Sequence, residues 1–423
     1  MDHLKGLFVF SAFFFFQMIC LSTEPLYAQE SILSSYERNF IRADLAGKTA
    51  ILSDAATDEN APQFMGDLYE FALQFALVNG DYLKDDPDMI SLVSTAARGA
   101  GTSGNLYSVK SLWDLFQVYT DPYSRVDILG ALATLGMGNQ VVIGNLNLFL
   151  RNEINSYKSS GSVNQGTDDT ASASAPEIPV LGACISALGK LGDSSSFSVL
   201  FSAMTAGYPD EIKRQALTAM DSIRGNYKDF LTDVIKKNPY PEKVAAFRLG
   251  AYNEKLSTAE RGELAETALE ISLEQVSGQE VSRVPDFGSD PFYAATLRYE
   301  AVIALTLLKW TPAAPLAIRN FYVVLSDYTN GAVPKERLIE AITCMGVMGN
   351  SDAAQALALQ LGYINSITEK SGEYDEAVVM ALINALGVLA DKSAFDNLLY
   401  IGYLNYSNPL QTAAREALNR LKW

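Results

Sequence analysis

The chain has 423 residues, with 32 Lys and Arg against 49 Asp and Glu, a net charge of −17 and one histidine, His3. Serine and cysteine triads, HExxH zinc sites and histidine proton shuttles all need an imidazole that titrates near neutral pH, so this composition disfavours them. The acidic balance also excludes nucleic acid as an expected partner, because binding to nucleic acid requires a basic face that neutralises phosphates.

The first 28 residues have the pattern of a secretory signal peptide. Lys5 precedes an apolar run at 6–21, and Ala28 is a small residue at a suitable cleavage position. We expect cleavage after Ala28, export to the periplasm or the extracellular space, and no membrane insertion afterwards. The alternatives are an uncleaved anchor and a lipoprotein cut before Cys20, which Ile19 disfavours because a small residue is usual there. The mature chain would remain acidic, with a net charge of −16 after loss of one basic and two acidic residues.

Two cysteines, Cys184 and Cys344, remain after such a cleavage. They lie 160 positions apart in apolar stretches rich in small residues. Nothing resembles a closely spaced disulfide framework or a CxxC pair. We therefore expect two buried thiols that pack as small hydrophobic side chains, with a long-range disulfide as the alternative.

One nine-residue phrase recurs without gaps at 185–193, 342–350 and 383–391. Its pattern is I-[STN]-[AC]-[LM]-G-[VK]-[LM]-[GA]-[DN]. Fainter copies of its Ala-Leu pair follow at offsets of 32 to 41 residues, at Ala131-Leu132 (once the polar tract at 157–176 is subtracted), Ala219-Met220, Ala304-Leu305 and Ala417-Leu418. A unit of this size holds two helices and two short turns, as in the repeats of α-solenoids.

The spacing within the phrase predicts a helix followed by a capped junction. Leu338, Ala341, Met345 and Met348 recur at intervals of three and four, which places them on one helical face. The Gly followed by Asp or Asn at the end of the phrase is expected to supply a C-cap for this helix and then an N-cap for the next one. Small residues in the Ala or Cys slot would let neighbouring helices approach closely.

These residues resemble the HEAT-repeat superfamily, particularly its short bacterial HEAT-like form. The resemblance is strong over 177–225 and 292–423, moderate over 122–155, and weak over 30–121 and 226–290. It implies an all-α fold, an α-solenoid of stacked antiparallel helix pairs that forms a right-handed superhelix. Most members of this superfamily are scaffolds that bind proteins, so the resemblance implies no catalytic activity and no cofactor.

The pattern predicts about nineteen helices, no strands and one solenoid of nine or ten units after the signal peptide. The expected segments are a signal peptide at 1–28, N-terminal helical repeats at 29–156, a Ser- and Gly-rich loop at 157–176, HEAT-like repeats at 177–277, a second loop at 278–291 and C-terminal repeats at 292–423. Loops of this length are functional or disordered, and for the Ser-rich one we favour disorder.

Three short motifs have simpler explanations than the chemistry they resemble. Gly99 to Gly104 matches GxGxxG, but a helical pattern precedes it where a dinucleotide site needs a strand, so we expect a turn between helices. Asp286-Phe287-Gly288 lacks the other kinase motifs. The acidic cluster Asp81, Asp85, Asp86 and Asp88 lacks the alternating spacing of a calcium loop, so a solvated turn is favoured over a calcium site, and no metal is expected.

A Gly-Tyr pair follows the Asp or Asn of three repeats by 12 to 15 residues, at Tyr208, Tyr363 and Tyr403. Tyrosine offers a large contact area at a low entropic cost, so a series of exposed tyrosines would suit partner binding. In the alternative interpretation the glycine caps a helix and the tyrosine packs over its last turn. These three tyrosines are the candidate binding residues.

The sequence thus favours an exported, non-catalytic scaffold that binds a protein or peptide on its concave face. The alternative is a secreted, all-helical toroid that cleaves glycosidic bonds with paired carboxylates, a chemistry that needs no histidine. Its sugar sites would usually contain tryptophan, and the chain has three, at positions 113, 310 and 423.

Overall fold

The computed structural model describes residues 32–58, 65–163, 178–276 and 286–422. The chain divides into two compact units, Met1–Gly225 and Asn226–Trp423. The segment expected to be a signal peptide lies outside the described residues. Among the helices of the described part, none is both long enough and apolar enough to span a bilayer.

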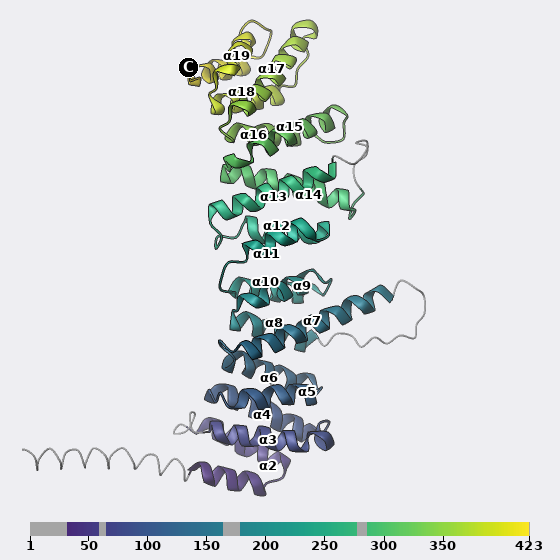
Figure 1. Ribbon diagram of the computed structural model, residues 1–423, viewed down its shortest axis with the longest axis vertical. Coiled ribbons are helices and arrows are strands. Elements are labelled where there is room, and N and C mark those ends of the chain that lie inside the picture. Colours follow the sequence, from purple (N-terminus) through teal and green to yellow (C-terminus); the bar gives the residue numbers. More distant parts are fainter. Residues whose placement is uncertain (1–31, 59–64, 164–177, 277–285, 423) are drawn as a thin grey trace, which may run out of the picture. The chain divides into compact units, whose positions relative to one another are not determined.

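Both units are built from helices, which confirms the all-α prediction for the described residues (Figure 1). These residues contain no strand, and one isolated bridge joins Asp391 and Lys422. The first unit contains a helix through 32–42, then α2 Leu45–Thr57, α3 Gly66–Leu83, α4 Pro87–Ser103, α5 Ser108–Val118, α6 Pro122–Leu135, α7 Gln140–Val163, α8 Ile178–Leu191, η1 Ser194–Ser196, α9 Phe197–Thr205 and α10 Asp210–Ser222. The second contains α11 Lys228–Lys237, α12 Tyr240–Ala251, α13 Thr258–Val276, α14 Asp290–Leu308, η2 Thr311–Ala313, α15 Ala314–Thr329, α16 Lys335–Val347, α17 Ser351–Ser371, α18 Glu376–Leu389, η3 Lys392–Ala394, α19 Phe395–Ile401 and α20 Asn408–Arg420.

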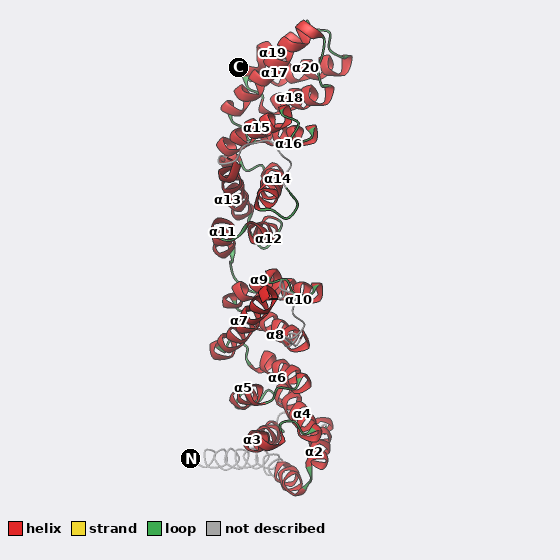
Figure 2. Ribbon diagram, turned by 90° about the vertical axis from the view of Figure 1, so that its right-hand side faces the viewer, coloured by secondary structure: helices red, strands yellow, loops and turns green. Residues whose placement is uncertain are grey.

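Each unit has two layers of helices. The even layer consists of the even-numbered helices, and each of them packs on the next even-numbered helix of its unit. The odd layer is built in the same way from α3 and α5, from α7 and α9, and from α11 through α19 in steps of two. Consecutive helices such as α5 and α6, or α13 and α14, also pack on each other and join the two layers. Figure 2 shows the two layers side by side within each unit, for example α3 and α5 beside α4 and α6.

The even layer is held together by glycines that meet alanines of the next even helix. A methyl group on Gly189 of α8 would lie 2.8 Å from the Cα of Ala219 in α10. A methyl group on Gly346 of α16 would lie 3.0 Å from the Cα of Ala385 in α18. The same relation joins Gly101 to Ala131 and Gly387 to Ala417. The small residues of the phrase therefore allow close approach of helix backbones, as the sequence predicts.

The end of the phrase forms the predicted helix junction. Asp193, Asn350 and Asp391 each accept a hydrogen bond from the backbone N–H two residues further on, and each opens the next helical element. The residues just before them, Gly192, Gly349 and Ala390, have left-handed φ angles of 65°, 63° and 54°. A left-handed residue after the last helical turn is the usual way to end a helix, because it turns the chain away from the axis.

Both segments expected to be loops contain helical residues at an edge. Helix α7 continues to Val163, so residues 157–163 are helical and 164–176 lie outside the described residues. The Tyr157 ring stacks on Tyr208 with centroids 4.1 Å apart, which extends the contact of α7 with the neighbouring segment beyond the predicted helix end. At the second loop, α14 begins at Asp290 and Pro291 lies in its first turn, where proline is well tolerated.

The chain divides into its two units at a position that the sequence does not mark. The pattern predicts one array interrupted at 157–176, whereas the boundary between the two compact units follows Gly225, inside the predicted segment 177–277. Residues 223–227 connect α10 to α11 without helix, and Gly225 has a φ of 113°. The boundary coincides with the start of 226–290, where the repeat phrase is weak.

The glycines of the GxGxxG motif do not all lie in a turn. Gly99 and Gly101 are buried inside α4, where Gly99 lies against the Tyr69 ring and Gly101 against Ala131. Gly104 alone ends the helix, with a φ of 73°. The prediction of a turn is therefore wrong for the first two glycines, whose role is close packing.

Candidate functional site

The three candidate tyrosines do not share one environment. Tyr208 is only 1% exposed, because the Tyr157 ring covers it. Burial raises the pKa of its hydroxyl to about 12. The Tyr157 hydroxyl donates a hydrogen bond to the carbonyl of Gly207, which fixes the two rings together. Tyr208 is therefore not displayed to a partner.

Tyr363 and Tyr403 are 63% and 77% exposed. Tyr363 lies in the middle of α17, and its neighbour Gly362 is not a cap: a methyl group there would lie 2.7 Å from the side-chain oxygen of Asn397 in α19. Tyr403 follows the last turn of α19. The capping interpretation fits Gly207, which has a φ of 88° just after α9, but it does not fit Gly362.

The two exposed tyrosines belong to a larger group of exposed apolar side chains on α17 and α19. On α17 the exposed residues recur every four positions, and on α19 they occupy the last turn and the residues after it. We call this group the C-terminal tyrosine surface: Leu359, Tyr363, Ile367, Leu399, Tyr400 and Tyr403. The Tyr400 hydroxyl donates a hydrogen bond to Glu369, 2.8 Å away, and this bond raises the Tyr400 pKa.

A buried network of hydrogen bonds holds α17 and α19 at a fixed separation beneath this surface. The Asn365 amide donates to the carbonyl of Asn397, and the Asn397 amide donates to the carbonyl of Ala358, at 3.0 and 2.9 Å. The Tyr406 hydroxyl donates to the Asn365 side-chain oxygen at 2.9 Å. Buried polar groups are costly unless they are paired, so this network favours one arrangement of the two helices.

A second candidate lies on the even layer of the first unit, where sequence analysis offered no site. We call it the α8–α10 hollow, a depression of about 410 Å³ between α8 and α10. It is lined by Ser186, Gly189, Lys190, Glu211, Arg214, Gln215, Thr218, Ala219 and Ser222. The sequence holds one signal of it: the sixth position of the phrase is Lys190 here but valine in the other two copies.

The cations of the α8–α10 hollow lack carboxylate partners. The Lys190 ammonium donates a hydrogen bond to the Thr134 hydroxyl of α6 at 2.8 Å, a neutral acceptor. No hydrogen bond or ion pair joins the Arg214 guanidinium to another residue of the described part. Lys213, its neighbour on α10, pairs instead with Asp210 at 3.1 Å.

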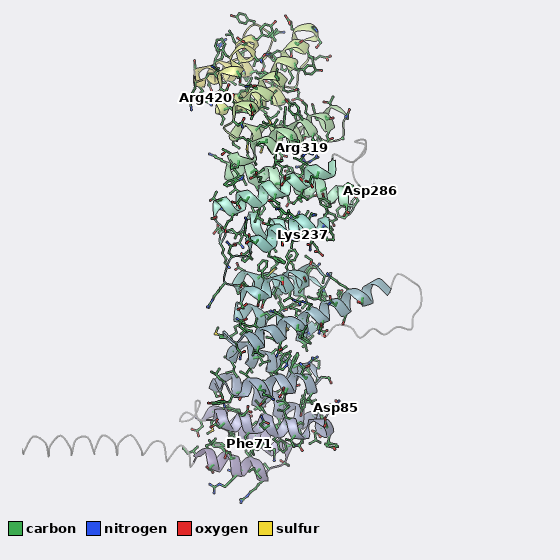
Figure 3. All side chains as sticks on the ribbon, viewed as in Figure 1. Phe71, Asp85, Lys237, Asp286, Arg319 and Arg420 are labelled. Carbon is green, nitrogen blue, oxygen red and sulfur yellow. The ribbon has the colours of Figure 1, made fainter. Side chains whose placement is uncertain are left out.

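The cysteines and the acidic cluster supply no obvious chemistry. Cys184 and Cys344 are buried and free, as expected of small packing residues. Burial raises the pKa of both thiols, that of Cys344 to about 11, so neither is a ready nucleophile. In the acidic cluster, Asp86 caps α4, and Asp85 lies at the turn before it (Figure 3). Within the described ranges, no group of three or more His, Cys, Asp or Glu residues is placed to hold a metal ion.

Comparisons with known proteins do not assign the chain to a family. No family model matches the sequence, and no curated protein matches it.

Proposed function

We propose that this protein is an exported scaffold, a HEAT-like α-solenoid that binds a protein or peptide partner. The observation that carries the proposal is the repeated glycine–alanine contact of the even layer, such as Gly189 with Ala219 and Gly346 with Ala385. The same contact, made by the same positions of a recurring phrase, is what stacking of equivalent units requires. Such a stack presents equivalent positions of successive helices as one extended binding face.

The even layer is the better candidate for the concave face. Its helices approach until a glycine of one meets the backbone of the next, whereas α17 and α19 of the odd layer meet through Asn365 and Asn397 side chains. In a curved stack the layer with the smaller spacing lies on the inner side. Exposed residues of the even layer in the second unit include Thr343 and Asn384, at the second position of the phrase. The C-terminal tyrosine surface would then give a second contact on the other layer.

Site-specific photo-crosslinking in cells tests both faces. A photoreactive phenylalanine would replace Asn384 on the even layer, Tyr363 on the odd layer, and exposed Asp229 on α11 as a control. We expect the first two positions to crosslink to the same partner and the control position to give no such product. Crosslinking at Asp229 equal to that at Asn384 would contradict a localised binding face.

Export is part of the proposal and can be tested on the same cells. Mass spectrometry of the extracytoplasmic fraction should identify a peptide that begins at Gln29, as cleavage after Ala28 requires. A peptide that includes residues 6–21 would contradict cleavage there.

The alternative of a carbohydrate enzyme gains no support from the α8–α10 hollow. Hydrolysis of a glycosidic bond with two carboxyl groups needs them about 5 to 9.5 Å apart across the substrate. Among the residues that line the hollow, Glu211 is the one carboxylate. Absence of any crosslinked partner, together with turnover of a glycan by the purified protein, would replace the scaffold proposal with this alternative.

A further inference from the structure

Most cations with a resolved contact in this acidic protein are matched by a carboxylate. The chain has 49 acidic residues for 32 basic ones, so partners are plentiful. The pairs of the described residues include Arg98–Asp127, Lys110–Asp114, Lys213–Asp210, Lys228–Glu263, Arg248–Glu300, Arg298–Asp327, Lys335–Asp375 and Arg337–Glu340. Lys48 and Lys243 instead donate to backbone carbonyls. Lys190 and Arg214 have neither a carboxylate nor a carbonyl partner in the described residues, and both line the α8–α10 hollow.

The hollow presents the donors of two cations beside several acceptors, among them the buried side-chain oxygen of Gln215, which has no hydrogen-bond partner within the described residues. The Thr218 hydroxyl donates to the carbonyl of Arg214 at 3.0 Å, and the Ser222 hydroxyl donates to the carbonyl of Thr218 at 3.1 Å, so each offers a ligand only its lone pairs. Arg214 has five N–H donors, and Lys190 retains two of its three after bonding Thr134. The exposed Ser186 hydroxyl is a further donor at the edge.

We propose that the α8–α10 hollow binds a carboxylate group, with Arg214 as its main ligand and Lys190 as a second positive charge. A guanidinium can hold both oxygens of a carboxylate in two parallel hydrogen bonds, which gives geometric selectivity as well as energy. The hollow, of about 410 Å³, is large enough for a carboxylate with the atoms that bear it. The inference does not depend on the scaffold proposal.

The charge balance of the hollow selects a monoanion. Lys190 and Arg214 contribute two positive charges and Glu211 one negative charge, so one negative charge on the ligand makes the site neutral. A phosphate dianion would leave an excess of negative charge beside Glu211, in a protein that is already acidic. The carboxylate could belong to an acidic side chain of a peptide or to a free small acid, and the test separates these sources.

Protection of Arg214 from chemical modification tests the proposal on the full-length protein. Phenylglyoxal modifies accessible arginines, and mass spectrometry would report the modified fraction of Arg214, with exposed Arg224 as an internal reference. The probes are the capped peptide acetyl-Gly-Glu-Gly-amide, its Gln analogue, propionate and inorganic phosphate, each up to about 10 mM to detect weak binding. We expect the Glu peptide to reduce the modification rate of Arg214 at least about threefold, and the Gln peptide to leave it unchanged.

Three variants test which residues of the hollow are responsible for any protection. Lys190→Gln should weaken it, Glu211→Gln should strengthen it, and Lys213→Gln should leave it unchanged, because Lys213 lies on the same helix but does not line the hollow. Protection by propionate as strong as that by the Glu peptide would identify a free acid as a sufficient ligand, and stronger protection by the peptide would identify an acidic side chain. Both results support a carboxylate site. The proposal would be overturned if no carboxylate protected Arg214, if the Gln peptide protected it as well as the Glu peptide, or if phosphate protected it more strongly than either peptide.

Discussion

Ala390 ends α18 in a conformation that suits glycine better. Its φ is 54°, and its N–H donates to the carbonyl of Leu386, in the position that Gly192 and Gly349 occupy after their own helices. A left-handed conformation costs an L-residue roughly 1–2 kcal/mol, while glycine loses about 0.5–1 kcal/mol more entropy on folding. We therefore expect Ala390→Gly to raise the free energy of unfolding by about 0.5 to 1 kcal/mol in urea denaturation.

Gly349→Ala is the matched control for this prediction. Both residues end even-layer helices of the second unit, and Gly349 has a φ of 63°. The substitution should lower the free energy of unfolding by about 1 kcal/mol, because it places a Cβ in the left-handed region. If Ala390→Gly lowered stability as well, the local backbone strain assigned to Ala390 would be wrong.

Asp391 links stability to pH through its role as a helix cap. Its bonds to the backbone N–H and the hydroxyl of Ser393 hold the pKa of the carboxyl below its usual value. A carboxyl whose pKa is lower in the folded state contributes stability above its unfolded pKa, near 3.9, and this contribution is lost as the pH falls through the folded value. Asp391→Asn keeps a capping oxygen, as Asn350 does, but removes the titration.

We expect Asp391→Asn to unfold in urea much like the parent chain at pH 7, and to lose less stability than the parent between pH 5 and about pH 2. Urea midpoints measured across this range give the comparison. An unchanged acid dependence would mean that Asp391 is not coupled to folding. Asp193 has its pKa lowered by bonds to Ser195 and Gln140, so Asp193→Asn should behave in the same way for the first unit.

Sequence reasoning succeeded where the cause is local and failed where it is not. The caps at Asp193, Asn350 and Asp391 follow from a pattern of adjacent residues, and the structure confirms them. The exposure of the candidate tyrosines does not follow from adjacent residues. Tyr208 is buried because α7 extends and brings Tyr157 over it, and these two residues are 51 positions apart. A Gly-Tyr pair carries no information about such a neighbour.

At the level of the helix, a glycine that contacts a neighbouring helix and a glycine that faces open space should respond in opposite ways to substitution by alanine. A methyl group on Gly189 would lie 2.8 Å from both the Cα and the Cβ of Ala219, so the backbones of α8 and α10 would have to separate. A methyl group on Gly130 of α6 meets no atom within 4 Å. Gly189→Ala should cost roughly 1–3 kcal/mol, the usual cost of overpacking. Gly130→Ala should gain about 0.5–1 kcal/mol from helix propensity.

Urea denaturation of the two variants, followed by circular dichroism, measures both changes in the free energy of unfolding in one experiment. The helical signal of the folded proteins should be unchanged, so the comparison is between midpoints. If Gly189→Ala were as stable as Gly130→Ala, the close approach of α8 and α10 would not be required for stability, and the phrase glycine would lose its explanation.

Helix order was the most predictable feature of the molecule, and the division into two units was the least. The phrase places even-layer helices at α8, α16 and α18 correctly, because each copy contains the apolar positions of its helix and the left-handed residue that ends it. The boundary after Gly225 depends on which helices contact one another, which a single sequence does not encode locally. The α8–α10 hollow was missed for the same reason, since Lys190 and Arg214 lie on different helices.

The two-unit organisation predicts how far along the chain a destabilising substitution should raise hydrogen exchange. In a stack whose helices contact mainly their neighbours, stability is a sum of local terms, so loosening one junction should raise hydrogen exchange nearby rather than everywhere. We expect Gly189→Ala to accelerate exchange in α6, α8 and α10 of the first unit, and Gly346→Ala to do so in α14, α16 and α18 of the second.

Hydrogen exchange measured by mass spectrometry on both variants of the full-length chain makes this a reciprocal test. Each variant serves as the control for the other, because both add one methyl group at the same position of the phrase. Exchange in the unit that carries no substitution should match the parent chain, since its own junctions are intact. An equal rise in both units would mean that the chain unfolds as one cooperative block, and additive nearest-neighbour stability would then be the wrong description of this protein.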